Sequence, residues 1–254
     1  MFAPTPRGSL TVPILWTTAV WFTAALLAGL AGVFDTEGVP VAIGVAAAIP
    51  PLLVIALLAW SPSFQEWTRS LDLRLLITLH MWRLVGFGFL ATWAAGALPG
   101  SFAWSAGYGD IMVGVTAPFV AFACLDKGRR GKAAFYGWTA FGVADLLLAI
   151  LLGVLHSDSP LGVLAEGSGS GVDILGRLPM SIIPTFVVPL MLALHAMSVY
   201  VARHHQWASA AAFTPSDGTG RRPRRTPRSP AGASRPVRPP SARRRRSRRT
   251  WPPP

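Results

Sequence analysis

The sequence predicts an all-α protein, a polytopic bundle of about six transmembrane helices followed by a disordered C-terminal tail. Of its 254 residues, 52% are hydrophobic and 13% are charged, whereas an average soluble domain carries about 25% charged residues. Six stretches are apolar enough to enter a bilayer. The net charge of +12 lies in the tail, because residues 203–254 hold 14 Arg and one acid, whereas residues 1–202 hold 9 basic and 10 acidic residues.

The six stretches define a predicted transmembrane domain over residues 1–202. A membrane helix satisfies its backbone amides internally and needs about 20 mostly apolar residues. The predicted spans are residues 11–33, 40–60, 75–98, 104–125, 133–155 and 178–202. The first continues too far to be a signal peptide and has no small-residue cleavage site, so we expect it to be retained. Pro50 and Pro51 in the second span, and Pro184 and Pro189 in the sixth, each remove an amide donor and predict kinks.

The distribution of Lys and Arg predicts the orientation, since cytoplasmic loops retain positive charge. One side has Arg7, Arg69, Arg74, the basic residues of 127–132 and the tail, whereas the other has acidic residues and only Arg177. We therefore expect both termini in the cytoplasm, which requires an even number of spans. The predicted location is the cytoplasmic (inner) membrane.

Five ionisable residues within the spans are the candidate site. They are His80 and Arg83 on the third span, Asp110 on the fourth, Asp145 on the fifth and His195 on the sixth. A charge at the bilayer centre costs about 2.5–3.5 kcal/mol on insertion scales, so such residues usually have partners or a function. His80 and Arg83 are three residues apart and share a helix face. We interpret the five as an intramembrane polar cluster.

Arg83 needs a carboxylate partner, because a guanidinium stays protonated even when buried. Counting the helical rise puts Arg83 and Asp145 near mid-membrane, so Asp145 is the first expected partner and Asp110 the second. Asp110 has an alternative role as the cap of a helix that starts near Ala106. His156, at the outer end of the fifth span, is expected to be solvated.

His80 and His195 fall at similar depth and have three interpretations. They can ligate a haem b iron, they can relay protons with Arg83 and Asp145, or they can bond to neighbouring helices. No other cofactor or metal is predicted, since the single cysteine, Cys124, cannot form a cysteine-based metal site alone. No phosphate-binding loop, nucleophile–base pair or zinc-ligand set stands out, so an enzyme is less favoured than a non-enzymatic role.

The Arg-rich tail, residues 203–254, has almost no aliphatic side chains and is predicted to be disordered. Near a membrane, each basic residue gains about 1 kcal/mol from anionic lipid headgroups, so these are its expected partners along with the bilayer. Nucleic acid is a less favoured partner, because the tail lacks interleaved aromatic residues for base stacking apart from Trp251.

Four segments together carry a family resemblance over about residues 80–195: HMWRLVGFGFL, GALPGSFAWSAGYGDIMVG, FGVADLLLAILLG and PTFVVPLMLALH. They resemble an uncharacterised family of small bacterial multi-pass integral membrane proteins. The resemblance implies that the five ionisable residues form a shared polar set. It implies no activity.

Three functions are compatible with this sequence. The first is a small transporter or proton- or ion-handling protein, in which Arg83 binds an anion or tunes a carboxylate, the two aspartates carry protons and the histidines gate them. The second is a haem-binding redox protein with His80 and His195 as axial ligands. The third is a non-catalytic scaffold whose buried charges fix helix pairing.

Overall fold

The computed structural model describes residues 10–35, 39–165 and 171–207, and within these ranges every regular element is helical. The chain divides into two units, residues 1–213 and 214–254. The predicted disordered tail lies outside the described residues from position 208 onward. The predicted all-α class is confirmed for the described residues.

Six helical segments of the described chain are long and apolar enough to cross a membrane, as predicted. They are Thr11–Leu30, Val41–Trp60, Leu73–Ala94, Gly100–Cys124, Gly128–Leu155 and Ile183–His204. The first two are α1 and α2, and the fifth is α7. The chain is therefore a membrane protein whose outer side chains face lipid. Leu15 and Leu30 of α1, with 64% and 69% exposure, are examples.

Three of the spans change helix type along their length. The third consists of α4 (Leu73–Thr78), the 3₁₀ segment η1 (Leu79–Gly86) and α5 (Phe87–Ala94). The fourth consists of α6 (Gly100–Phe119) and the π-helical η2 (Val120–Cys124), and the sixth of the π-helical η4 (Ile183–Val187) and α8 (Val188–His204). A short 3₁₀ helix, η3 (Asp173–Gly176), precedes the sixth span.

The prolines of the second and sixth spans, which predicted kinks, act differently. Pro50 and Pro51 lie within α2, which continues as one α-helix through both. Pro184 lies in the π-helical η4, and Pro189 follows in the first turn of α8, where a missing amide donor costs little. Of these two spans, only the sixth changes helix type at its prolines. In the fourth span, Pro118 likewise lies just before the π-helical η2.

The span boundaries differ from the predicted ones in both directions. The first span ends at Leu30 rather than 33 and the sixth begins at Ile183 rather than 178, whereas three spans begin earlier than predicted. The third span begins at Leu73 rather than 75, since Asp72 caps it by accepting a hydrogen bond from the Arg74 amide. The fourth begins at Gly100 rather than 104, directly after Pro99. The fifth begins at Gly128 rather than 133, so its first turn carries the basic residues.

An additional short helix, α3 (Pro62–Arg69), was not among the predicted elements. Ser61 caps it by accepting a hydrogen bond from the Phe64 amide at 3.4 Å, and Pro62 occupies its first turn. Trp67 of α3 donates its indole N–H to the Thr11 hydroxyl at 3.1 Å, which connects α3 to the start of α1. Its eight residues are amphipathic rather than continuously apolar, so the length of apolar runs does not predict it.

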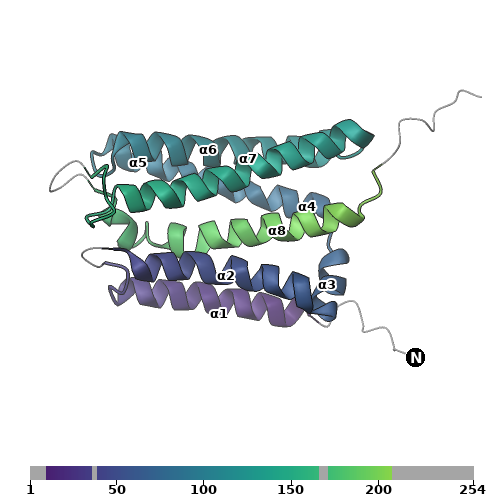
Figure 1. Ribbon diagram of the computed structural model, residues 1–254, viewed down its shortest axis with the longest axis horizontal. Coiled ribbons are helices and arrows are strands. Elements are labelled where there is room, and N and C mark those ends of the chain that lie inside the picture. Colours follow the sequence, from purple (N-terminus) through teal and green to yellow (C-terminus); the bar gives the residue numbers. More distant parts are fainter. Residues whose placement is uncertain (1–9, 36–38, 166–170, 208–254) are drawn as a thin grey trace, which may run out of the picture. The chain divides into compact units, whose positions relative to one another are not determined.

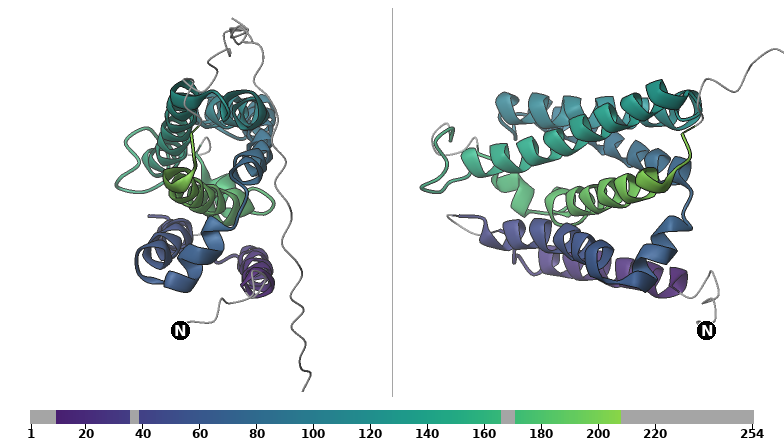
Figure 2. Two further views of the ribbon diagram at one scale, coloured as in Figure 1. Left: turned by 90° about the vertical axis from the view of Figure 1, so that its right-hand side faces the viewer. Right: turned by 45° about the vertical axis from the view of Figure 1, so that its right-hand side comes forward.

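The spans surround α8, which places the sixth span at the centre of the first unit. Figure 1 shows α1 and α2 side by side, with α8 between them and the group formed by α5, α6 and α7. The end-on view in Figure 2 shows the same separation. The start of α1 and the end of α8 lie at the same end of the bundle (Figure 1). This agrees with an even number of crossings.

Candidate functional site

The third span presents Arg83 and His80 to the interior from η1. A 3₁₀ helix has 3.0 residues per turn, so side chains three positions apart eclipse one another and point the same way. Both side chains are fully buried, with 0% exposure. Asp110, Asp145 and His195 are also buried, at 4%, 7% and 1%.

The Arg83 guanidinium is held by both predicted carboxylates. Its Nε donates to Asp110 Oδ1 of α6 at 2.7 Å, and its Nη2 donates to Asp145 Oδ2 of α7. Its Nη1 donates to the carbonyl oxygen of Gly142, also on α7, at 3.0 Å. The first and second expected partners therefore bind the same cation. The alternative role of Asp110 as a helix cap is wrong, because α6 starts ten residues earlier at Gly100.

The side chains of Arg83, Asp110 and Asp145 do not balance in charge. One guanidinium faces two carboxylates, so with both aspartates ionised and both histidines neutral the group carries one net negative charge. A buried net charge in a low-dielectric interior is strongly disfavoured. Binding one proton within the group removes it.

His195 of α8 completes the contacts of Arg83. Its Nε2 lies 3.5 Å from Arg83 Nη1. A guanidinium only donates hydrogen bonds, so this nitrogen accepts, and the proton of a neutral imidazole then resides on Nδ1. In the described part of the chain, His195 Nδ1 has no hydrogen-bond partner.

His80 has the same tautomer, but its other ring nitrogen lacks a partner. Its Nδ1 faces the carbonyl oxygen of Leu76 at 3.0 Å and donates to it, which leaves Nε2 as the lone-pair nitrogen. Among the described residues this buried Nε2 has no partner either. The two imidazoles therefore bring one free acceptor and one free donor into the same interior.

The imidazole rings of His80 and His195 lie against each other, with centroids 4.1 Å apart and planes at 44°. Trp138 of α7 flanks both rings at 5.1 and 5.4 Å, and its N–H donates to the Thr116 hydroxyl at 3.1 Å. Two axial histidines would have to stand on opposite faces of a porphyrin. Rings in direct contact leave no space for one, so the haem alternative does not fit this arrangement.

Glycines on α6 and α7 make these close approaches possible. A Cβ at Gly109 would overlap the Asp145 carboxylate. A Cβ at Gly142 would lie 2.7 Å from His195 Nε2 and 3.1 Å from Arg83 Nη1. The absence of a side chain at these two positions is what lets the charged groups of neighbouring helices meet.

Sequence reasoning missed several of these contributors. Gly142 and Trp138 were not singled out, although Gly142 precedes Asp145 by three residues, one helical turn, in the segment FGVAD. Gly109 directly precedes Asp110 in the segment SAGYGD, which is helical in α6. The sequence signal for these two glycines is a small residue within one helical turn of an acidic residue in a membrane span.

The prediction for His156 is wrong. This side chain is 1% exposed rather than solvated. Its Nδ1 donates to the Leu152 carbonyl oxygen at 2.9 Å, and its Nε2 accepts from the Ser101 hydroxyl at 2.7 Å. A hydrogen bond to α6 thus makes burial at the end of α7 possible. His156 packs at the opposite end of the bundle, away from Arg83 and the four ionisable residues around it.

Comparison with known families identifies the chain. The family model described as "Domain of unknown function (DUF8737)" matches residues 40–203, which is more than half of the sequence. The chain belongs to this family. The matched region spans α2 to α8 and includes all five ionisable residues, as well as the second span, which the sequence resemblance did not cover.

The family has no assigned function, which agrees with the expectation of an uncharacterised family. No curated protein and no solved structure matches the chain significantly. Among the described residues, no group of three or more His, Cys, Asp or Glu is arranged to hold a metal ion. Any functional argument therefore rests on the geometry of the cluster.

Proposed function

We propose that this protein binds and transfers protons, or a small ion that substitutes for them, at the intramembrane cluster formed by His80, Arg83, Asp110, Asp145 and His195, hereafter the Arg83 cluster. The observation that carries this proposal is the single guanidinium held between two buried carboxylates. One carboxylate is enough to neutralise Arg83. The second carboxylate and the two imidazoles go beyond what a structural ion pair needs.

The roles within the cluster follow from its hydrogen bonds. Arg83 is a fixed cation that keeps the aspartates in place, because guanidinium does not release its proton. Asp110, Asp145 and the two imidazoles exchange protons. His195 connects the guanidinium to the neighbouring imidazole of His80, whose Nε2 is available as an acceptor. Chains of acids and histidines of this kind are the usual proton relays of membrane proteins.

A scaffold remains the competing role, since the same bonds join η1, α6, α7 and α8. The two roles differ in what the second carboxylate does. In a scaffold, Asp145 and Asp110 only hold helices together. In a proton-handling protein, neutralising either one abolishes transfer even when the fold survives.

We also propose that the protein lies in the cytoplasmic membrane with both termini inside. Arg74 and Arg129 lie in the first turns of α4 and α7, and Arg203 lies in the last turn of α8. These helix ends lie at the same end of the bundle as the start of α1 (Figure 1). The positive-inside rule assigns such an end to the cytoplasm. The tail would then face an anionic leaflet, and we propose that its arginines bind lipid headgroups.

Proton flux into liposomes tests the proton-handling role. Protein reconstituted with an entrapped pH indicator and an imposed membrane potential should acidify or alkalinise the lumen faster than empty liposomes. Asp145→Asn should reduce the rate to that of empty liposomes, provided that the purified variant elutes as a single folded species. Asp126→Asn is the matched control, because Asp126 is 73% exposed and pairs with Arg74 outside the cluster. Equal rates for wild type, Asp145→Asn and empty liposomes would contradict the proposal and favour the scaffold.

A further inference from the structure

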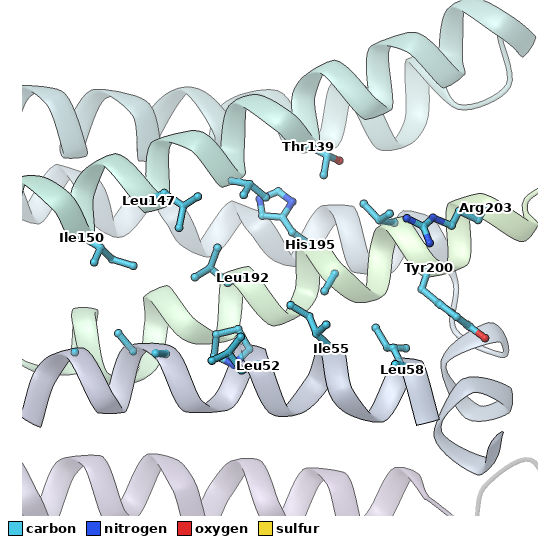
Figure 3. A pocket seen from close by; sticks show the side chains of 18 residues that line it. Leu52, Ile55, Leu58, Thr139, Leu147, Ile150, Leu192, His195, Tyr200 and Arg203 are labelled. Carbon is cyan, nitrogen blue, oxygen red and sulfur yellow. The ribbon is translucent and has the colours of Figure 1, made fainter. Parts of the chain in front are cut away.

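A cavity of about 720 Å³ lies between α2, α7 and α8 and is lined mainly by aliphatic side chains. Figure 3 shows Leu52, Leu147 and Leu192 among them. The unpaired polar atoms of His195 and Thr139 are buried beneath this lining, so they bind nothing from the cavity. An accessible nucleophile lies instead at the end of the bundle where α6 begins and α7 ends.

The side chains of Ser101 and His156 form a hydrogen-bonded pair at this end. Ser101 lies in the first turn of α6, and His156 directly follows α7. The Ser101 hydroxyl donates to His156 Nε2 at 2.7 Å, while His156 Nδ1 donates to the Leu152 carbonyl oxygen at 2.9 Å. The bond to Leu152 fixes the tautomer in which Nε2 carries the lone pair. A serine nucleophile and its general base need this arrangement, which the 55 positions between the two residues conceal in the sequence.

The two members of the pair differ in exposure. His156 is 1% exposed, whereas Ser101 is exposed. Because the imidazole is buried, its lone pair is directed to the serine hydroxyl and not to bulk water. The hydroxyl itself remains accessible to a substrate. The Leu152 carbonyl oxygen takes the place that a carboxylate occupies in a catalytic triad, where it holds the imidazole in position and accepts from Nδ1–H.

The start of α6 also offers donors for a negatively charged oxygen. No side chain caps this helix, and among the described residues the backbone amides of Gly100 and Ser101 donate to no carbonyl oxygen. Helical side chains lean toward the N-terminus, so the Ser101 hydroxyl lies at the same end as these amides. Amides at the N-terminus of a helix favour negative charge and can stabilise the oxyanion of a tetrahedral intermediate.

Two tryptophans indicate the depth of Ser101 in the membrane. Trp93 of α5 and Trp104 of α6 have ring centroids 5.3 Å apart and are 40% and 50% exposed. Trp104 follows Ser101 by three residues, and Trp93 packs at Gly100, where a Cβ would lie 3.0 Å from the indole nitrogen. Exposed indoles favour the layer between hydrocarbon and headgroups. The ester carbonyls of diacyl lipids lie in the same layer, so Ser101 is at the depth of these esters.

We infer that Ser101 and His156 form a second site, which transfers acyl groups from carboxylic esters of membrane lipids to water. Ser101 Oγ bonds to the ester carbonyl carbon while its proton passes to His156 Nε2, and the free amides of α6 stabilise the oxyanion. The carbonyl forms again as the bond to the alcohol breaks, and the leaving alcohol takes the proton from His156. Water then attacks the acyl-serine with His156 as base, which releases a carboxylic acid and returns the proton to Ser101.

Labelling with a fluorophosphonate probe tests the nucleophile in the full-length protein in detergent. An activated serine oxygen bonds to the phosphorus of the probe, and fluoride leaves. We expect labelling at Ser101, located by mass spectrometry of the peptides, and none at this position in Ser101→Ala. His156→Gln should slow labelling at least about 100-fold, the smaller contribution of a general base. Ser105→Ala is the matched control and should label as wild type does, because Ser105 is also exposed on α6 but donates to the Ser101 carbonyl oxygen and not to a histidine.

Reconstituted protein tests the substrate class. Liposomes that contain a phospholipid with a fluorogenic acyl chain report release of the fatty acid, and 4-nitrophenyl butyrate reports hydrolysis of a soluble ester. The wild-type protein should release the lipid acyl chain at least about 100-fold faster than Ser101→Ala does. Hydrolysis of the soluble ester alone would overturn the assignment to lipid esters.

Two labelling results would overturn the inference. One is the absence of the probe from Ser101 in the wild-type protein, a measurement that needs no variant to fold. The Ser101 hydroxyl would then only stabilise the buried imidazole. The other is labelling that His156→Gln leaves unchanged in protein that elutes as wild type does. The inference is independent of the Arg83 cluster, since Ser101 and His156 contact none of its members in the described chain. Proton flux should therefore be the same in wild type and Ser101→Ala.

Discussion

Arg83 and His195 lie 112 positions apart in the sequence, yet Arg83 Nη1 and His195 Nε2 are 3.5 Å apart in the interior of the bundle. This contact connects the charged group on the third, fourth and fifth spans to the central helix α8. It also determines which nitrogen of His195 carries the proton.

The charge balance predicts that Arg83→Gln is more damaging than Asp145→Asn. Arg83→Gln leaves two facing carboxylates without their cation and should cost on the order of 3–5 kcal/mol of unfolding free energy. Asp145→Asn leaves Arg83 paired with Asp110 at 2.7 Å and should cost less, about 1–3 kcal/mol. Combining Arg83→Gln with Asp110→Asn and Asp145→Asn should recover part of the loss.

Thermal unfolding in detergent measures these differences. Arg74→Gln is the control, because the Arg74–Asp126 pair is exposed and should contribute less than about 1 kcal/mol. A cost for Asp145→Asn as large as that of Arg83→Gln would mean that the two carboxylates do not share the guanidinium.

The glycine contacts predict opposite effects for two substitutions on α7. Gly142→Ala should lower the unfolding temperature and separate His195 from Arg83, because its Cβ would lie 2.7 Å from His195 Nε2. Gly137→Ala should be neutral or stabilising by up to about 1 kcal/mol, since a Cβ there meets no atom within 4 Å and alanine is the better helix former. Parallel melting curves of both variants give the comparison. Equal behaviour of the two would show that α7 does not approach α8 this closely.

The proposed orientation predicts the activity of reporter fusions. A reporter that is active only in the cytoplasm should work when fused after Arg203 and fail when inserted within residues 158–165. A reporter that is active only outside should behave in the reverse way. Activity of the cytoplasmic reporter from the loop and not from the C-terminal fusion would invert the topology.

The charge of the tail predicts salt-dependent lipid binding. Truncation after residue 212 removes 13 arginines and should weaken sedimentation with vesicles that contain anionic lipid, most clearly at low salt. The unfolding temperature in detergent should not change, because a segment with few apolar side chains adds little to a hydrophobic core. A clear loss of thermal stability on truncation would assign the tail a structural role.

Much of the fold was predictable because the bilayer imposes simple rules. Spans follow from the length of apolar runs, and five buried ionisable residues stand out against them at once. The helix α3 was not predictable in this way, since its eight residues are amphipathic and its position depends on Trp67 bonding to Thr11. His156 was misjudged because its burial depends on Ser101, a residue 55 positions away.

The class of the protein, the number of its spans and the residues that carry charge into the membrane all follow from the amino-acid sequence. These properties depend on composition within one segment, and hydrophobic transfer acts on each segment separately. Helix packing, in contrast, makes both aspartates share Arg83 and brings the tilted rings of His80 and His195 into contact. Those properties depend on how far each helix is rotated and how closely glycines let it approach its neighbours, and side-chain packing between helices decides both.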